Sequence, residues 1–238
     1  MLKIWVNGAN GKMGRVTVDA IQAAPDCQLV GSSTRGDPLA QQLQQVAPDV
    51  VIDFTTPATV FENAHIILAS GARPVIGTTG LSPDQLDILR TTCQKEKRGA
   101  LVVPNFSIGA ILMMRYAKDA AHYFGYAEIT ETHHPEKHDA PSGTAIKTAA
   151  LMAEHFKPAN PAHNDKPAQG ERHHGILIHS LRLAGVFAEQ TVSFGGTGET
   201  LSITHRATDR QSMMPGVLLA CRQVMTLDHL VYGLEALL

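Results

Sequence analysis

Short apolar segments alternate with longer segments of helical periodicity over residues 2–103, and this alternation restricts the possible folds more than any other feature. The run Asp49-Val-Val-Ile-Asp-Phe54 is typical of a strand that is covered on both faces, as in a parallel sheet. Because strand–helix–strand units are right-handed, their repetition predicts a doubly wound α/β sheet of Rossmann type. Strands are expected at 2–7, 27–33, 49–54, 74–77 and 100–103, and helices at 12–24, 39–46, 57–70 and 82–97.

The pattern changes after about residue 106. Further helices are expected at 108–124, 142–156 and 215–225, a loop at 157–170, and strands at 126–132, 175–182, 186–194 and 200–206. Strands that follow one another favour an antiparallel or mixed sheet over further strand–helix–strand units. We therefore expect one domain formed by residues 1–106 together with 211–238, and a second, mixed α/β domain formed by residues 107–210.

Charge and cysteine content narrow the class of protein. The net charge is −2 and no basic stripe is present, which argues against a nucleic-acid partner. Cys27, Cys93 and Cys221 are widely spaced and form no CxxC, which favours a reducing compartment. No apolar stretch approaches the roughly 18 residues that span a bilayer, and no cationic leader precedes an apolar run. We expect a cytoplasmic protein with no membrane segment and no signal peptide.

A glycine-rich turn joins the first predicted strand to the first predicted helix. Gly8, Gly11 and Gly14 form GxxGxxG, which differs from the commoner GxGxxG. Glycines in this position permit a tight turn and a close approach of the backbone to a pyrophosphate at the helix N-terminus. A strand–helix turn without a ligand is the alternative, but the position of the glycines favours a dinucleotide site.

The end of the second predicted strand bears on which dinucleotide binds. A site that prefers NAD usually has an acidic residue there, about 20 residues after the glycines. This chain has Ser32-Ser33-Thr34-Arg35 instead, so Arg35, together with Lys12 in the turn, could pair with a 2′-phosphate. NADPH is therefore favoured and NADH remains possible; the alternative for each cation is a solvated surface position.

Two more loops follow predicted parallel strands. They are Gly77-Thr78-Thr79-Gly80 and Val103-Pro104-Asn105-Phe106. Ligands of open α/β sheets bind at the carboxyl ends of the strands, so both loops are expected to flank a nicotinamide, although each could be a simple turn.

The segment Glu131–Ala145 combines groups for proton transfer with a site for an anion. His133, His134 and Lys137 come shortly before the turn Pro141-Ser142-Gly143-Thr144, which opens a predicted helix. A capping Ser142 would leave the amides of the two following residues available to a carboxylate. This combination predicts an anionic substrate that must be protonated.

A metal site is the alternative for this segment, since His133, His134, His138 and Asp139 are all potential ligands. The HExxH arrangement requires a helix, and the prolines at 135 and 141 interrupt one here. No second cluster completes a ligand set either. We expect no metal.

With these motifs in order, the chain resembles the 4-hydroxy-tetrahydrodipicolinate (dihydrodipicolinate) reductase family over essentially its whole length. The resemblance rests on Gly8–Gly14, Ile52-Asp53-Phe54-Thr55, Gly77–Gly80, Asn105-Phe106-Ser107, Glu131–Ala145 and Ile203-Thr204-His205-Arg206-Ala207. It implies a Rossmann-like N-terminal domain and a mixed α/β domain for substrate binding and oligomerisation, with a homotetramer built through the second domain's sheet. It also implies NAD(P)H-dependent reduction of 4-hydroxy-tetrahydrodipicolinate to tetrahydrodipicolinate in lysine and diaminopimelate biosynthesis.

The resemblance assigns roles to individual residues. His133 is similar to the family's acid/base histidine and Lys137 to its proton-donating lysine. His134, Gly143 and Thr144 match the residues that contact a carboxylate of the dicarboxylate substrate. The positions that match the cofactor site are Gly8, Ala9, Asn10, Gly11, Lys12, Met13, Arg35, Gly77, Thr78, Thr79, Val103, Pro104, Asn105 and Phe106.

The chain also departs from the family pattern. Thr34 replaces an acidic residue that some members carry before the arginine, which weakens the expectation of equal NADH and NADPH use. The segment between the second and third strands is short, and Ala188-Glu189-Gln190 stands where members often have Gly-Glu-His. Two other functions are considered: a non-catalytic NADPH-binding sensor and a metal-dependent hydrolase.

Overall fold

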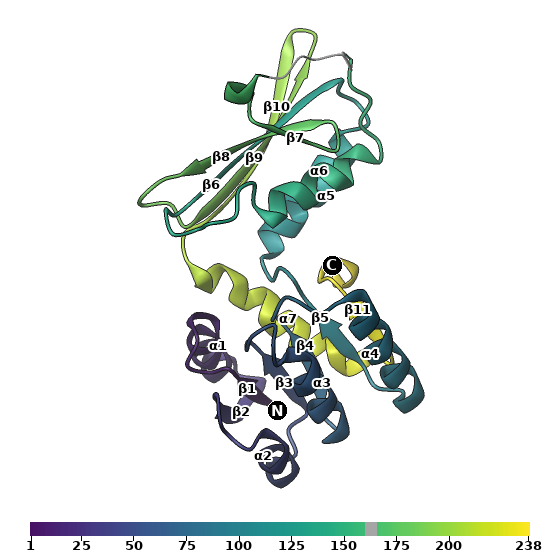
Figure 1. Cartoon of the computed structure of the whole chain (residues 1–238). Coiled ribbons are helices and arrows are strands. Elements are labelled where there is room, and N and C mark those ends of the chain that lie inside the picture. Colours follow the sequence, from purple (N-terminus) through teal and green to yellow (C-terminus); the bar gives the residue numbers. More distant parts are fainter. Residues whose placement is uncertain (160–165) are drawn as a thin grey trace. The chain divides into compact units, whose positions relative to one another are not determined.

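The computed structural model describes residues 1–159 and 166–238, which form two compact units (Figure 1). Unit 1 comprises Met1–Ile108 and Met213–Leu238, and unit 2 comprises Gly109–Ser212. Within the described part of the chain, no helix combines the length and the apolar character needed to span a bilayer.

Unit 1 contains a six-stranded sheet in the order β11-β5-β4-β3-β1-β2, and every pairing in it is parallel. The strands are β1 (Leu2–Asn7), β2 (Cys27–Ser33), β3 (Val50–Asp53), β4 (Arg73–Ile76), β5 (Ala100–Val102) and β11 (Leu230–Tyr232). The strand order reverses at β1, which lies between β2 and β3, and ligands of such sheets bind at this point. The predicted doubly wound α/β fold is therefore confirmed.

Five helices of unit 1 cover this sheet (Figure 1). They are α1 (Lys12–Ala23), α2 (Leu39–Val46), α3 (Val60–Ala69), α4 (Pro83–Glu96) and α7 (Met214–Gln223). Helices α3 and α4 pack on β4 and β5 in one apolar cluster, and α2 and α3 pack on β1 and β3 in another. Helix α7 lies against α1, where the Thr17 hydroxyl contacts the Met214 sulfur at 3.7 Å.

The segment after residue 213 packs closely against the rest of unit 1. A Cβ at Gly216 would lie only 1.9 Å from the carbonyl oxygen of Phe106, so α7 can approach the loop after β5 only with glycine at this position. Strand β11 then pairs with β5. The C-terminal residues therefore support the loop that the sequence analysis assigns to the nicotinamide.

Unit 2 contains a mixed sheet in the order β10-β9-β6-β8-β7. The strands are β6 (Tyr126–His133), β7 (Glu171–His173), β8 (Ile176–Arg182), β9 (Ala188–Gly196) and β10 (Glu199–Ala207). Strand β6 is parallel to β8 and antiparallel to β9, and helices α5 (Ile108–Ala120) and α6 (Gly143–Ala153) lie beside the sheet (Figure 1). The predicted second domain with a mixed sheet is confirmed.

Several segment boundaries differ from the expectation. Helix α3 begins at Val60, not at 57, because the Thr56 carbonyl accepts from the amides of both Thr59 and Val60 in an initial turn. Helix α5 ends at Ala120 in a turn. The predicted loop at 157–170 lies partly outside the described residues, and short 3-10 helices occur at Pro167–Gln169, Arg210–Met213, Val224–Thr226 and Glu235–Leu237.

Candidate functional site

The glycine turn of unit 1 brings backbone segments into close contact. Gly8 has a φ of +86°, and a Cβ there would lie 2.4 Å from the Phe54 carbonyl oxygen. A Cβ at Gly14 would lie 2.2 Å from the Gly8 carbonyl oxygen. Gly11 precedes α1 without a side-chain cap, so amides at the start of that helix are available to an anion.

A pocket of about 360 Å³ opens beside this turn. It brings together the predicted residues Gly8, Asn10, Gly11 and Arg35, whereas Ala9, Lys12 and Met13 do not line it. Its other lining residues are Asn7, Thr34, Gly36, Asp37, Leu39, Phe54, Thr55, Thr56, Thr59 and Asn63.

Asp37 is a carboxylate that the sequence analysis did not assign to this pocket. Its Oδ2 accepts hydrogen bonds from the Thr34 amide at 2.7 Å and the Thr34 hydroxyl at 3.0 Å. The carboxylate is therefore engaged in closing the turn, while Arg35 beside it is exposed and has no ion-pair partner among the described residues.

The two other predicted loops of unit 1 meet at a smaller pocket of about 60 Å³. The predicted residues Thr78, Thr79 and Pro104 line it. Gly80, Leu81, Val102 and Tyr232 complete the lining. The rings of Phe54 and Phe106 meet edge to face at 5.6 Å, and a Cβ at Gly77 would overlap both. Sequence reasoning missed Tyr232, because its strand is too short to show a periodicity.

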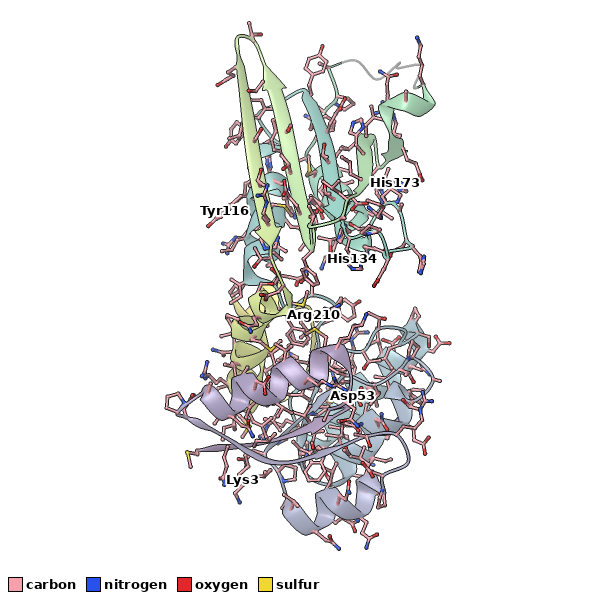
Figure 2. The ribbon with its side chains drawn as sticks, turned by 90° about the vertical axis from the view of Figure 1, so that its left-hand side faces the viewer. Lys3, Asp53, Tyr116, His134, His173 and Arg210 are labelled. Carbon is pink, nitrogen blue, oxygen red and sulfur yellow. The ribbon has the colours of Figure 1, made fainter. Side chains whose placement is uncertain are left out.

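The buried side chain of Asp53 connects the loops of unit 1 through hydrogen bonds; Figure 2 labels this residue. It is fully buried, and its carboxylate accepts from Asn7 Nδ2 at 2.9 Å, Asn63 Nδ2 at 3.0 Å and the Thr78 hydroxyl at 2.7 Å. The amide and hydroxyl of Thr55 also donate to it. Asn7 ends β1, Thr55 and Thr78 follow β3 and β4, and Asn63 lies on α3, so one buried carboxylate connects the carboxyl ends of three strands with a helix.

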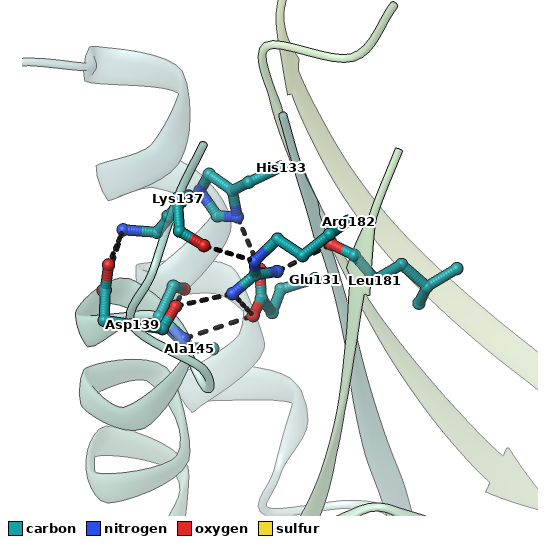
Figure 3. Close-up of polar contacts among 8 residues, drawn as sticks. Glu131, His133, Lys137, Asp139, Ala145, Leu181 and Arg182 are labelled. Carbon is teal, nitrogen blue, oxygen red and sulfur yellow. Dashed lines mark hydrogen bonds and ion pairs between the residues drawn. The ribbon is translucent and has the colours of Figure 1, made fainter. Parts of the chain in front are cut away.

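In unit 2, strands β6 and β8 place an acid, a histidine and an arginine side by side (Figure 3). Glu131 is fully buried, and its Oε2 lies 2.5 Å from Nδ1 of His133. Arg182, paired in register with His133, binds both carboxylate oxygens of Glu131 at 3.1 Å. The Ser142 amide also donates to this carboxylate, at 3.3 Å. Sequence reasoning named neither Glu131 nor Arg182 as a site residue.

The hydrogen bonds to Glu131 determine its charge. Burial by itself would raise the pKa of this carboxyl, but hydrogen bonds from His133, Arg182 and Ser180 outweigh burial and lower the pKa from 4.5 to about 2. Glu131 is therefore a carboxylate throughout the neutral range.

This pKa shift predicts an acid sensitivity of the fold. Because the folded-state pKa is depressed, the stabilisation by Glu131 is complete above pH 4.5 and is lost as the pH falls towards 2. We expect Glu131→Gln to unfold with a weaker pH dependence in that window than wild type, measured by urea unfolding at pH 3 to 6 with circular dichroism. An equal slope for both proteins would contradict the assignment.

The loop between β6 and α6 carries the predicted catalytic lysine. Lys137 Nζ contacts both carboxylate oxygens of Asp139 at 2.8 Å, and the pKa of Asp139 is lowered chiefly by this hydrogen bond. The loop backbone is held by Arg182, which donates to the carbonyls of Lys137 at 3.0 Å and Asp139 at 2.6 Å (Figure 3). The ammonium group of Lys137 is therefore paired within its own loop.

The start of α6 has the features of an anion cradle. Ser142 caps the helix by accepting from the Ala145 amide at 3.2 Å. Among the described residues, the amides of Gly143 and Thr144 have no acceptor. A Cβ at Gly143 would meet nothing within 4 Å, so this side of the turn is open.

His134 lies beside two residues that the sequence did not indicate. Its ring is stacked on Phe187 with the centroids 6.2 Å apart, and the Arg210 guanidinium lies 5.1 Å from the Phe187 centroid. Figure 2 labels His134 and Arg210. Arg210 thus adds a positive charge near a predicted carboxylate contact. Across the described residues, no group of three or more His, Cys, Asp or Glu side chains is arranged to hold a metal ion.

Comparison with known proteins identifies the family. Residues 2–106 match the family "Dihydrodipicolinate reductase, N-terminus", and residues 109–238 match "Dihydrodipicolinate reductase, C-terminus". The chain belongs to the dihydrodipicolinate reductase family. The resemblance stated from the sequence motifs is thereby confirmed.

Relatives of the dihydrodipicolinate reductase family match over the full length. The 4-hydroxy-tetrahydrodipicolinate reductase of Coxiella burnetii (strain Dugway 5J108-111) is 55% identical, covering 100% of this chain and 99% of its own. The enzyme of the same name from Legionella pneumophila (strain Lens) is 48% identical, with 99% of each chain covered. Among solved structures, dipicolinate-bound dihydrodipicolinate reductase from Paenisporosarcina sp. TG-14 is 38% identical, with a TM-score of 0.91 and complete coverage of both chains.

Proposed function

We propose that this chain reduces 4-hydroxy-tetrahydrodipicolinate to tetrahydrodipicolinate with NAD(P)H, as a step of lysine and diaminopimelate biosynthesis. Family membership over the whole length supports this activity. The observation that carries it is the grouping of His133, Lys137 and the open N-terminus of α6 in one unit. A protein that only senses NADPH has no need for a proton donor beside an anion cradle.

The residues of unit 2 divide the chemistry between them. The 4-hydroxyl group of the substrate must leave as water, which gives a conjugated cyclic imine. When bound, NAD(P)H supplies the hydride that reduces this imine. His133 and Lys137 deliver the proton that the resulting enamine carbon takes up. The amides of Gly143 and Thr144, together with His134, bind a carboxylate of the substrate. The dipicolinate bound to the Paenisporosarcina relative is a dicarboxylate of the same kind.

Unit 1 is the proposed site of the dinucleotide. The pyrophosphate would lie against the glycine turn and the start of α1, with the adenosine end in the pocket that Arg35 lines. Thr78, Thr79 and Pro104 would border the nicotinamide. NADPH is the favoured cofactor, because Arg35 is available for a 2′-phosphate while Asp37 is engaged by Thr34.

A substitution at Arg35 tests the cofactor preference. We expect Arg35→Ala to raise the KM for NADPH about 10- to 100-fold, because a charge-assisted phosphate contact contributes about 1.5–3 kcal/mol. The KM for NADH should change less than about threefold. Arg90→Ala, an exposed arginine on α4 that pairs with Asp87, is the matched control. Equal effects on the two cofactors would contradict the role of Arg35.

A cytoplasmic homotetramer that assembles through the sheet of unit 2 is the proposed state in solution. Tyr126 on β6 and Leu201 on β10 are large, exposed and apolar, as expected at such an interface. Light scattering coupled to size exclusion measures the mass directly, and a monomer of 25.6 kDa at micromolar concentration would exclude the tetramer.

NADPH oxidation tests the activity itself. The assay follows the loss of NADPH absorbance with freshly generated product of dihydrodipicolinate synthase and is repeated with NADH. Turnover that depends on this substrate is expected. Binding of NADPH without turnover would support the sensor instead, and unchanged activity after exhaustive chelation would exclude a metal-dependent hydrolase.

A further inference from the structure

Glu131 occupies a position where a buried strand usually carries an apolar side chain. It is fully buried on β6, in line with the apolar Ile129. Burying a carboxylate costs several kcal/mol, and well-packed apolar residues are often at least as stabilising as a buried ion pair. Because the Glu131 carboxylate lies beside His133, we infer that it orients the side chains around it.

The contact between Glu131 and His133 defines which ring nitrogen carries hydrogen. An ionised carboxylate only accepts hydrogen bonds, so at 2.5 Å from Glu131 Oε2 the Nδ1 atom of His133 must be the donor. Nε2 is then the nitrogen that gains and loses a proton during turnover. This pairing also restricts rotation of the ring, whose side chain is 15% exposed.

Arg182 extends the arrangement to the loop of Lys137. Every nitrogen of its guanidinium donates hydrogen bonds (Figure 3). Nε donates to the Lys137 carbonyl, and Nη1 donates to Glu131 and to the Leu181 carbonyl. Nη2 donates to Glu131 and to the Asp139 carbonyl. A lysine, with all its donors on one nitrogen, cannot make this set of contacts. One side chain thus links the partner of His133 to the backbone on which Lys137 is mounted.

We propose that Glu131 and Arg182 are positioning residues of the reductase, with Glu131 fixing the Nδ1–H form of His133 and Arg182 fixing the loop that carries Lys137. This proposal rests on the proposed function for its kinetic consequences, but the protonation it assigns to His133 is independent of turnover.

Neutron diffraction from deuterium-exchanged crystals tests the assignment without any assay. Crystals of the wild-type protein are kept at alkaline pH, and the positions of deuterium on the ring of His133 are read from the nuclear density. The deuteron is expected on Nδ1 of His133, between the ring and Glu131. A deuteron on Nε2 with none on Nδ1 would overturn the proposal, whether or not the protein reduces the proposed substrate.

Kinetics of two variants test the positioning role. Glu131→Gln and Arg182→Lys should each lower kcat about 10²-fold, because small misplacements of reacting groups cost that much, while the KM for NADPH stays within about threefold. Glu171→Gln is the matched control, since Glu171 pairs with His173 at the same spacing but on the exposed edge strand β7. Unchanged kcat in both folded variants would overturn the positioning role, and a variant that fails to fold leaves the neutron measurement decisive.

Discussion

Replacing Lys137 with alanine is expected to lower kcat by about 10²- to 10⁴-fold, the usual contribution of a positioned proton donor. Among the described residues, the ammonium group of Lys137 pairs with Asp139, and the loop backbone is held independently by Arg182. The variant should therefore fold normally and retain NADPH binding. Steady-state kinetics with saturating NADPH measure the effect.

Lys157→Ala is the control, because Lys157 is an exposed lysine of the same unit outside the loop between β6 and α6. Near-normal turnover by folded Lys137→Ala would show that this lysine is not the proton donor. His133→Asn is expected to lose activity on the same scale, since it removes the other group that can transfer a proton.

Replacing Asp53 with alanine is expected to destabilise unit 1 by about 3–5 kcal/mol, because the buried donors of Asn7 and Thr78 and the half-buried donor of Asn63 lose their acceptor. Trp5 is the only tryptophan and reports on this unit. It is connected to the network, since its Nε1 donates to the Ser33 hydroxyl, which in turn donates to Asn7 Oδ1. Urea unfolding followed by tryptophan fluorescence measures the loss.

Asp87→Ala is the control for this change, since Asp87 is an exposed carboxylate of unit 1 and should contribute no more than about 0.5 kcal/mol. A loss of less than about 1 kcal/mol in Asp53→Ala would show that the network is dispensable for stability. The Asp53 variant should also bind NADPH more weakly, because the three loops around the pocket lose their common anchor.

The sequence predicted much of the fold, because long apolar runs and helical periodicities are local signals. The run at 49–54 predicted β3, and the segment at 82–97 predicted α4, which begins with a capping box between Ser82 and Gln85. Strands β7 and β11, at Glu171–His173 and Leu230–Tyr232, were missed. Strands this short show no periodicity, and their pairing with β8 and β5 depends on the tertiary structure.

The sequence likewise predicted only part of the candidate site. Residues His133 to Thr144 are contiguous, so the sequence alone grouped the proposed proton donors with the proposed anion cradle. Arg182 is separated from Glu131 by 51 positions, and their contact depends on the register of β6 against β8. Asp53 and Asn63 meet only because α3 returns onto the sheet. Sequence periodicity gives no information on such contacts.

The central claim is that the loop of Lys137 and the start of α6 hold a dicarboxylate. A crystal structure of this protein with dipicolinate tests this claim most directly. The account predicts one carboxylate of dipicolinate within hydrogen-bonding distance of the Gly143 and Thr144 amides, with Lys137 Nζ moved from Asp139 to the ligand. Dipicolinate bound elsewhere, with Lys137 still paired to Asp139, would contradict it.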